Sequence, residues 1–216
     1  MSWRSLLVAG LVAVAASSSA RAAQPAFVRN VTNPWFPLEP GTVFVYTGEK
    51  EGKHGRELVT VTHATKVIDG VRCTAVADRL YLRGRLAERT TDWYAQDVHG
   101  TVWYFGEETA ELNAAGKVTS REGTWRSSVN GAKAGIFMPA HPRVGQSFRQ
   151  EYLSGQAEDH FQVIRLSRRS LQTKEWTPLE PDTLDHKLYR RGTGLVTEET
   201  VKGANERWTL ADVRHG

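Results

Sequence analysis

The stretch ELVTVTHATKVIDGVRCTAVA, residues 57–77, decides the fold class of this chain. Asp69-Gly70 stands between two runs rich in Val, Ile and Thr, and Asp-Gly in that setting is a strong short-range signal for a two-residue hairpin turn. On both sides the apolar residues recur with a period of two, which is typical of strands and not of an amphipathic helix. We therefore expect two antiparallel strands joined by a tight turn.

The same alternation continues along most of the chain. Further strands are expected at 42–47, 80–82, 86–94, 102–105, 146–153, 159–166, 174–177, 186–190, 195–201 and 207–213. Consecutive hairpins describe a meander. The sequence thus predicts an all-β, antiparallel meander that forms a curved sheet, a half-barrel or a barrel. Only 107–115 and 127–134 have room for a helical turn, so at most one or two short helices are expected.

The N-terminus has the three parts of a secretory signal peptide. Arg4 supplies a positive charge, residues 6–16 are apolar, and small residues lead to Ala20-Arg21-Ala22. The apolar run is shorter than the roughly 20 residues that a membrane-spanning helix needs, so we expect no stable transmembrane anchor. Cleavage after Ala22 would leave an extended entry segment, residues 23–41, and a single β domain, residues 42–216, in a secreted or periplasmic protein.

The charge of the chain argues against a nucleic-acid partner. Without Arg4 and Arg21 of the predicted leader, the net charge falls from +4 to about +2. The longest basic runs are the pairs Arg168-Arg169 and Arg190-Arg191, and nucleic-acid binding needs a dense basic stripe. We expect no nucleic-acid partner.

Cys73 is the single cysteine, so no intramolecular disulfide can form. It shares an alternating face with Val71 and Ala75. A small buried apolar side chain explains it better than a reactive thiol does.

Several motifs resemble a family of exported bacterial proteins of unassigned function. They lie at 33–42, 92–97, 102–107, 138–140, 150–152 and 174–181. The segment Gly192-Thr193-Gly194-Leu195-Val196 is similar, more weakly, to the end of periplasmic sheets that wrap lipids, such as the lipoprotein carriers. The resemblance implies an exported β protein and carries over no catalytic residue.

Aromatic residues give one candidate site. Trp93, Tyr94, Trp103, Tyr104 and Phe105 fall on two paired strands, where adjacent residues point to opposite faces of the sheet. One set of rings can then pack in a core while the other lines a ligand pocket, to which Tyr152 and Trp176 could contribute. Plain cross-strand aromatic packing is the alternative explanation.

A carboxylate and histidine cluster gives the other candidate site. Its members are Glu151, Glu158, Asp159, His160, Glu175 and His186. Carboxylates with imidazoles suit a divalent metal or a general acid/base pair. A solvated hairpin end with charge pairs to Arg149 and Arg165 explains the same residues without any site. No cofactor motif is evident: the sequence has no nucleophile elbow, no zincin motif and no phosphate-binding loop.

Two classes of function follow. The first is a non-enzymatic exported binding protein that holds an apolar or amphipathic, lipid-like molecule in a curved sheet. The second is a metal-assisted or acid/base enzyme that uses the carboxylate and histidine cluster. A third hypothesis is that the chain is a purely structural envelope protein.

Overall fold

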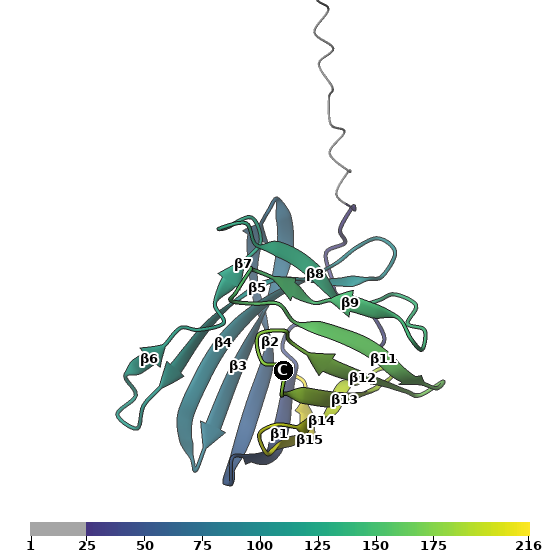
Figure 1. Cartoon of the computed structure of the whole chain (residues 1–216). Coiled ribbons are helices and arrows are strands. Elements are labelled where there is room, and N and C mark those ends of the chain that lie inside the picture. Colours follow the sequence, from purple (N-terminus) through teal and green to yellow (C-terminus); the bar gives the residue numbers. More distant parts are fainter. Residues whose placement is uncertain (1–24) are drawn as a thin grey trace, which may run out of the picture.

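The computed structural model describes residues 25–216, and the predicted leader, residues 1–22, lies outside the described residues (Figure 1). Every regular element in this part of the chain is a strand. The strands are β1 (Val43–Lys50), β2 (Lys53–Ile68), β3 (Val71–Leu82), β4 (Arg85–Gln96), β5 (Val102–Leu112), β6 (Val118–Ser120), β7 (Trp125–Arg126), β8 (Lys133–Met138), β9 (Ser147–Arg149), β10 (Glu151–Tyr152), β11 (His160–Leu166), β12 (Ser170–Trp176), β13 (Leu184–Arg190), β14 (Gly194–Lys202) and β15 (Glu206–Arg214). The predicted all-β fold class is confirmed.

The strands form one antiparallel sheet. Their order is β10-β8-β5-β4-β3-β2-β1-β15-β14-β13-β12-β11-β9, with β6 and β7 paired to β5 off this path. The predicted meander is therefore present twice, from β1 to β5 and from β11 to β15, and the pairing of β1 with β15 joins the two halves. Figure 1 shows the long strands β2 to β4 curving to face the shorter strands β11 to β13.

The sheet nearly closes into a barrel. Its two end strands, β9 and β10, are separated in the chain by Gln150 alone, yet β10 pairs with β8 and β9 pairs with β11. Gly135 in β8 permits this approach, because a Cβ there would lie 2.4 Å from the carbonyl oxygens of Arg149 and Gln150. The chain at Gln150 thus bridges the seam between the first and last parts of the sheet.

The decisive hairpin has the predicted turn. Asp69 and Gly70 have φ values of +50° and +78°, which suits a two-residue type I′ loop. Neither stretch with room for a helix forms one. Instead β5 continues to Leu112, held by a 3.0 Å cross-strand hydrogen bond between the hydroxyl groups of Thr109 and Thr90, and β8 begins at Lys133.

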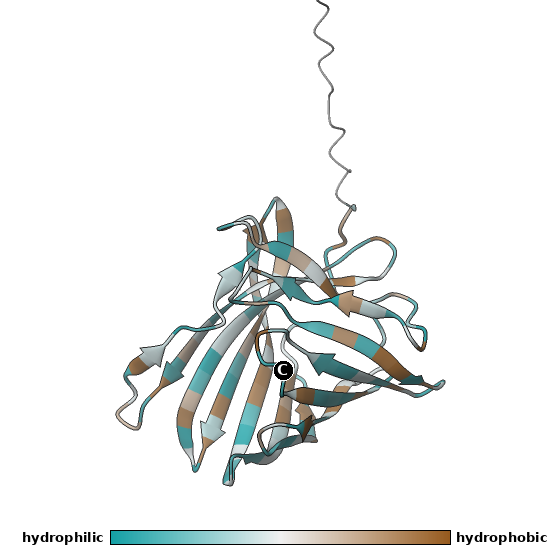
Figure 2. Cartoon of the chain, viewed as in Figure 1, coloured by the Kyte–Doolittle hydropathy of each residue, from teal (hydrophilic) through white to brown (hydrophobic). Residues whose placement is uncertain are grey.

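The interior of the barrel holds the main core, and the entry segment closes one end of it. Val31, Trp35 and Leu38 are buried in this core. The amide oxygen of Gln96 accepts hydrogen bonds from the backbone of Thr32 and Asn33 at 2.8 and 2.7 Å and fixes the segment. Figure 2 shows hydrophilic and hydrophobic residues alternating along the long strands, as expected where one face turns inward.

A smaller core lies on the outer face of the sheet. Cys73, Trp93 and Phe105 are buried there, and Phe27 of the entry segment packs against the Phe105 ring at 5.5 Å between centroids. The interpretation of Cys73 as a buried apolar side chain is confirmed. Burial also raises its pKa to about 12, which keeps the thiol protonated.

Candidate functional site

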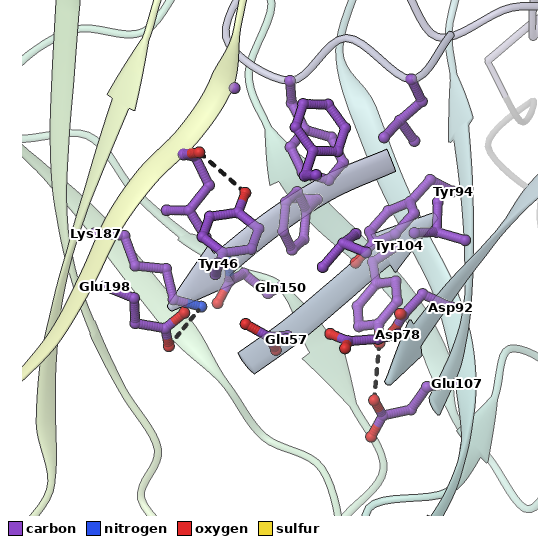
Figure 3. A pocket seen from close by; sticks show the side chains of 18 of the residues that line it. Tyr46, Glu57, Asp78, Asp92, Tyr94, Tyr104, Glu107, Gln150, Lys187 and Glu198 are labelled. Atoms are coloured by element: carbon purple, nitrogen blue, oxygen red, sulfur yellow. Dashed lines mark hydrogen bonds and ion pairs between the residues drawn. The ribbon is translucent and has the colours of Figure 1, made fainter. Parts of the chain in front are cut away.

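A cavity of about 290 Å³ lies inside the barrel. Side chains from the entry segment, from most of the long strands and from the seam at Gln150 line it, so the barrel as a whole defines its shape (Figure 3). One part of its wall is apolar and aromatic, and the other part carries carboxyl groups.

The apolar part of the wall is a group of packed aromatic rings. Tyr94 and Tyr104 stack at 4.8 Å between ring centroids, and Phe36 and Phe137 meet the Tyr94 ring edge-on at 5.1 and 4.9 Å. Val59 and other aliphatic side chains complete this surface. Such rings offer apolar contact area of defined shape at little conformational cost.

The polar part of the wall holds eight carboxyl groups and one lysine. The carboxyl groups are those of Glu57, Asp78, Asp92, Glu107, Glu151, Asp159, Glu175 and Glu198, and the lysine is Lys187. The acids come from β2, β3, β4, β5, β10, the loop before β11, β12 and β14, and Lys187 comes from β13. Along each strand every second residue faces inward. Figure 3 shows Glu57, Asp78 and Asp92 grouped on one side, with Lys187 and Glu198 across the cavity.

Lys187 is paired with carboxylates from both neighbouring strands. Its Nζ lies 3.0 Å from Glu175 Oε2 and 3.4 Å from Glu198 Oε1. The Thr173 hydroxyl donates a 3.0 Å hydrogen bond to the other oxygen of Glu175. Although burial alone would lower the pKa of Lys187, these two carboxylates raise it well above its ordinary value, so the ammonium stays charged.

Tyr104 links two further carboxyl groups. Its hydroxyl lies 2.5 Å from Asp92 Oδ1 and 3.0 Å from Glu107 Oε2. A phenol has one proton, so when it donates to Asp92 it can only accept at its second contact. The Tyr104 hydroxyl can donate to either acid, so we expect the other acid to be protonated and to donate to the phenol oxygen. Burial and the nearby charge of Asp92 raise the pKa of Glu107 well above its ordinary value, in agreement with this arrangement.

Burial raises the pKa values of most of these acids. It brings the pKa of Asp92 to about 7 despite the opposing Tyr104 hydrogen bond, and the pKa of Glu198 to about 7 despite Lys187. Burial and the neighbouring Asp159 raise the pKa of Glu151 to about 8. Several carboxyl groups of the cavity therefore hold protons near neutrality.

These shifts predict that stability falls as the pH rises from about 5 to about 8. Acids whose pKa is higher in the folded than in the unfolded chain make the folded state bind more protons in this window, so the free energy of unfolding decreases with pH. Each group contributes a slope of up to about 1.4 kcal/mol per pH unit while it titrates. Thermal unfolding followed by circular dichroism at several pH values measures this. The stability of an Asp92→Asn variant should depend less on pH than that of the parent. An unfolding temperature that does not decrease as the pH rises from about 5 to about 8 would contradict the prediction.

Two polar groups face the cavity without a partner. Gln150 is 5% exposed, and its side-chain amide has no hydrogen-bond partner among residues 25–216. Asp78 Oδ1 is also buried and unpaired within that part of the chain, although the Asp78 carboxyl group also has a side-chain hydrogen bond with Glu57. A buried polar group without a hydrogen bond is costly, which points to a molecule that supplies one.

The predicted aromatic site separates into two faces. Tyr94 and Tyr104 line the cavity, whereas Trp93, Trp103 and Phe105 belong to the outer core. Tyr152 and Trp176 lie away from the cavity wall: Arg149 packs over the Tyr152 ring at 4.4 Å, and Trp176 stacks on His160 at 5.6 Å. The prediction that adjacent rings point to opposite faces is confirmed, and two of the seven aromatic residues are at the cavity.

The predicted carboxylate and histidine cluster is also divided. Glu151, Asp159 and Glu175 line the cavity. Glu158 instead accepts a 2.8 Å hydrogen bond from the Gly155 amide in the hairpin loop, His160 lies 3.3 Å from Arg149 Nε, and His186 pairs across the sheet with Lys174 and Glu199. Among residues 25–216, no group of three or more His, Cys, Asp or Glu side chains has the arrangement that could hold a metal ion.

The sequence-based search missed most of the polar wall. Glu57, Asp78, Asp92, Glu107, Gln150, Lys187 and Glu198 were not among its candidates. A signal was present, because Asp78 lies between Val76 and Leu80 on one strand face, and Asp92 lies between Thr90 and Tyr94. A carboxylate on the same strand face as residues of the core indicates that the interior is partly polar.

Comparisons with known proteins give no family. No protein-family model and no curated protein matches the chain. Within residues 25–216, no helix has the length and hydropathy that a membrane crossing requires. Two crystal structures resemble it loosely. A candidate exported protein with a YmcC-like fold from Bacteroides fragilis has 11% sequence identity and a TM-score of 0.46 over 88% of this chain and 99% of that one. A candidate lipoprotein from Parabacteroides distasonis has 10% identity and a TM-score of 0.43 over 89% and 100%. At these TM-scores the likeness carries no argument about function.

Proposed function

We propose that this chain is an exported, non-enzymatic binding protein that holds one small amphipathic molecule inside its barrel. The observation that supports this most is the divided cavity wall, with the Tyr94, Tyr104, Phe36 and Phe137 rings on one part and carboxyl groups on the other. At about 290 Å³ the cavity is near the lower end of the range for small-molecule sites. The unpartnered amide of Gln150 supports an occupant with a polar group.

A cavity-filling substitution tests this proposal. Val59→Trp places a bulky ring in the cavity, and we expect it to reduce the affinity for the neutral apolar probe N-phenyl-1-naphthylamine by at least about tenfold. Val67→Trp is the matched control, because Val67 lies on the same strand and is 65% exposed. Fluorescence titration of protein purified from cells that express the full chain measures both affinities, and its mass shows whether residues 1–22 have been removed.

The proposal fails if the parent protein shows no saturable binding of the probe. It also fails if Val59→Trp binds as tightly as the parent while remaining folded by circular dichroism. Equal losses in the two Trp variants would place the probe somewhere other than the barrel interior.

An acid/base enzyme is the second candidate, and the Glu151–Asp159 pair favours it. Both acids line the cavity, and burial together with their mutual repulsion raises the pKa of Glu151 to about 8. Carboxyl groups with separated pKa values can serve as acid and base. Chemical conversion of a bound molecule that stops in a Glu151→Gln variant would favour this candidate over simple binding.

A further inference from the structure

We infer that the polar group of the bound molecule is a cation of the alkylamine class, carried on a short apolar chain. This inference rests on the proposed function, because it identifies the kind of ligand that the same cavity takes. It concerns the side of the cavity formed by Glu57, Asp78 and Asp92, together with the seam residue Gln150 (Figure 3).

The first step is the imbalance of charge around the cavity. Eight carboxyl groups face a single basic side chain among the described lining residues. That side chain, Lys187, already contacts Glu175 and Glu198 at 3.0 and 3.4 Å. No protein cation therefore remains for the opposite side, where the Glu57 and Asp78 carboxyl groups face each other.

The second step is the set of unused acceptors. Asp78 Oδ1 is buried on this side without a hydrogen-bond partner within residues 25–216, and the Gln150 amide faces the same cavity nearer to Lys187 (Figure 3). An ammonium group has three N–H donors and no acceptor, so it matches a site that offers carboxylate and amide oxygens. Each of its hydrogen bonds to a carboxylate would be charge-assisted.

The third step excludes other polar groups. A carboxylate or phosphate head group would add a further anion beside these acids, and Lys187, the one basic side chain among the described lining residues, is already paired. Burial raises the pKa values of Glu57 and Asp78, and a nearby cation lowers the pKa of a carboxyl group. A neutral hydroxyl could bond with Asp78 but would not favour the ionised form of either acid. A bare metal ion lacks a matching set of ligands in the described residues and would leave the aromatic wall unused.

The fourth step concerns the apolar part of the occupant. The stacked rings of Tyr94 and Tyr104 continue from the carboxyl groups, since the Tyr104 hydroxyl itself bonds to Asp92. A molecule whose ammonium lies at Asp78 can thus extend its chain along these rings toward Phe36 and Phe137. Aromatic faces also attract a nearby cation, which adds to the preference for an amine.

Three probes of equal length test the inference. Decylamine, decanol and decanoate are each titrated against the protein with N-phenyl-1-naphthylamine bound, near neutral pH. We expect decylamine to displace the probe at a concentration at least about tenfold lower than decanol, with decanoate the weakest of the three.

Variants locate the amine site. The double variant Glu57→Gln/Asp78→Asn should lose the tenfold preference for decylamine but keep its affinity for decanol, which also reports that it is folded. Glu108→Gln is the matched control, because its side chain is exposed on β5 beside the inward-facing Glu107. If the double variant does not fold, the single variant Asp78→Asn gives the same comparison.

The outcomes separate this inference from the proposed function. Binding of decanol as tightly as decylamine, or an unchanged preference in the double variant, overturns the cation inference and leaves a binding protein for neutral molecules. If neither the naphthylamine probe nor any of the three decyl compounds binds, both the cation inference and the proposed function are overturned.

Discussion

Replacing Lys187 by Met is expected to destabilise the fold by about 3–5 kcal/mol near pH 8. Lys187 is the one basic group that the described residues place at the cavity, and it compensates both Glu175 and Glu198. Removal of one partner of a buried ion pair leaves the other charge without compensation in a low-dielectric site. Urea unfolding followed by tryptophan fluorescence gives the free energy of unfolding for parent and variant.

The loss should be smaller near pH 5. Without the ammonium group, the pKa of Glu198, which is already about 7, rises further. The carboxyl group can then avoid the penalty by taking up a proton, and it does so more completely in acid. The stability of the variant should therefore fall more steeply with rising pH than that of the parent.

Lys202→Met is the matched control. Lys202 lies 3.1 Å from Asp182, but the two side chains are 57% and 95% exposed, and such surface pairs contribute about 1 kcal/mol or less. If Lys187→Met costs no more than Lys202→Met near pH 8, the Lys187 ion pairs do not hold the cavity wall together.

The fold was predictable where local signals decide it. Asp69-Gly70 specifies its hairpin because a type I′ turn needs positive φ at both positions, and the alternating runs around it place β2 and β3. The strand β8 was missed for the opposite reason. Its segment around Gly135 is short and contains a glycine, so its own sequence favours no strand. The segment forms a strand because it pairs with β5 on one side and β10 on the other in the nearly closed sheet.

The site was harder to predict because a period of two does not say which face is inside. Tyr94 and Tyr104 could be proposed from their paired positions, but Trp93 and Trp103 carry the same signal on the outer face. Only closure of the sheet decides between the faces. Glu57 and Asp78 look like solvent-facing residues until β2 and β3 curve around the cavity, and Gln150 gains its position from the seam, which joins strands far apart in sequence.

Trp93 and Tyr94 are adjacent in β4 and test that division of faces directly. Trp93→Ala is expected to cost about 3–5 kcal/mol, because the ring is 5% exposed in the outer core and its truncation leaves a void between Phe105 and Ala75. The substitution should leave the affinity for N-phenyl-1-naphthylamine within about twofold of the parent, since the ring does not reach the cavity.

Tyr94→Ala, in contrast, should weaken binding of the probe. Its ring stacks on Tyr104 and forms part of the cavity wall, so its removal enlarges an existing space and should weaken probe binding by about tenfold. The two measurements for each variant are the free energy of unfolding from urea titration and the dissociation constant of the probe, taken well below the unfolding midpoint. A Trp93→Ala protein that is folded but no longer binds would show that the outer core, and not the barrel interior, holds the ligand.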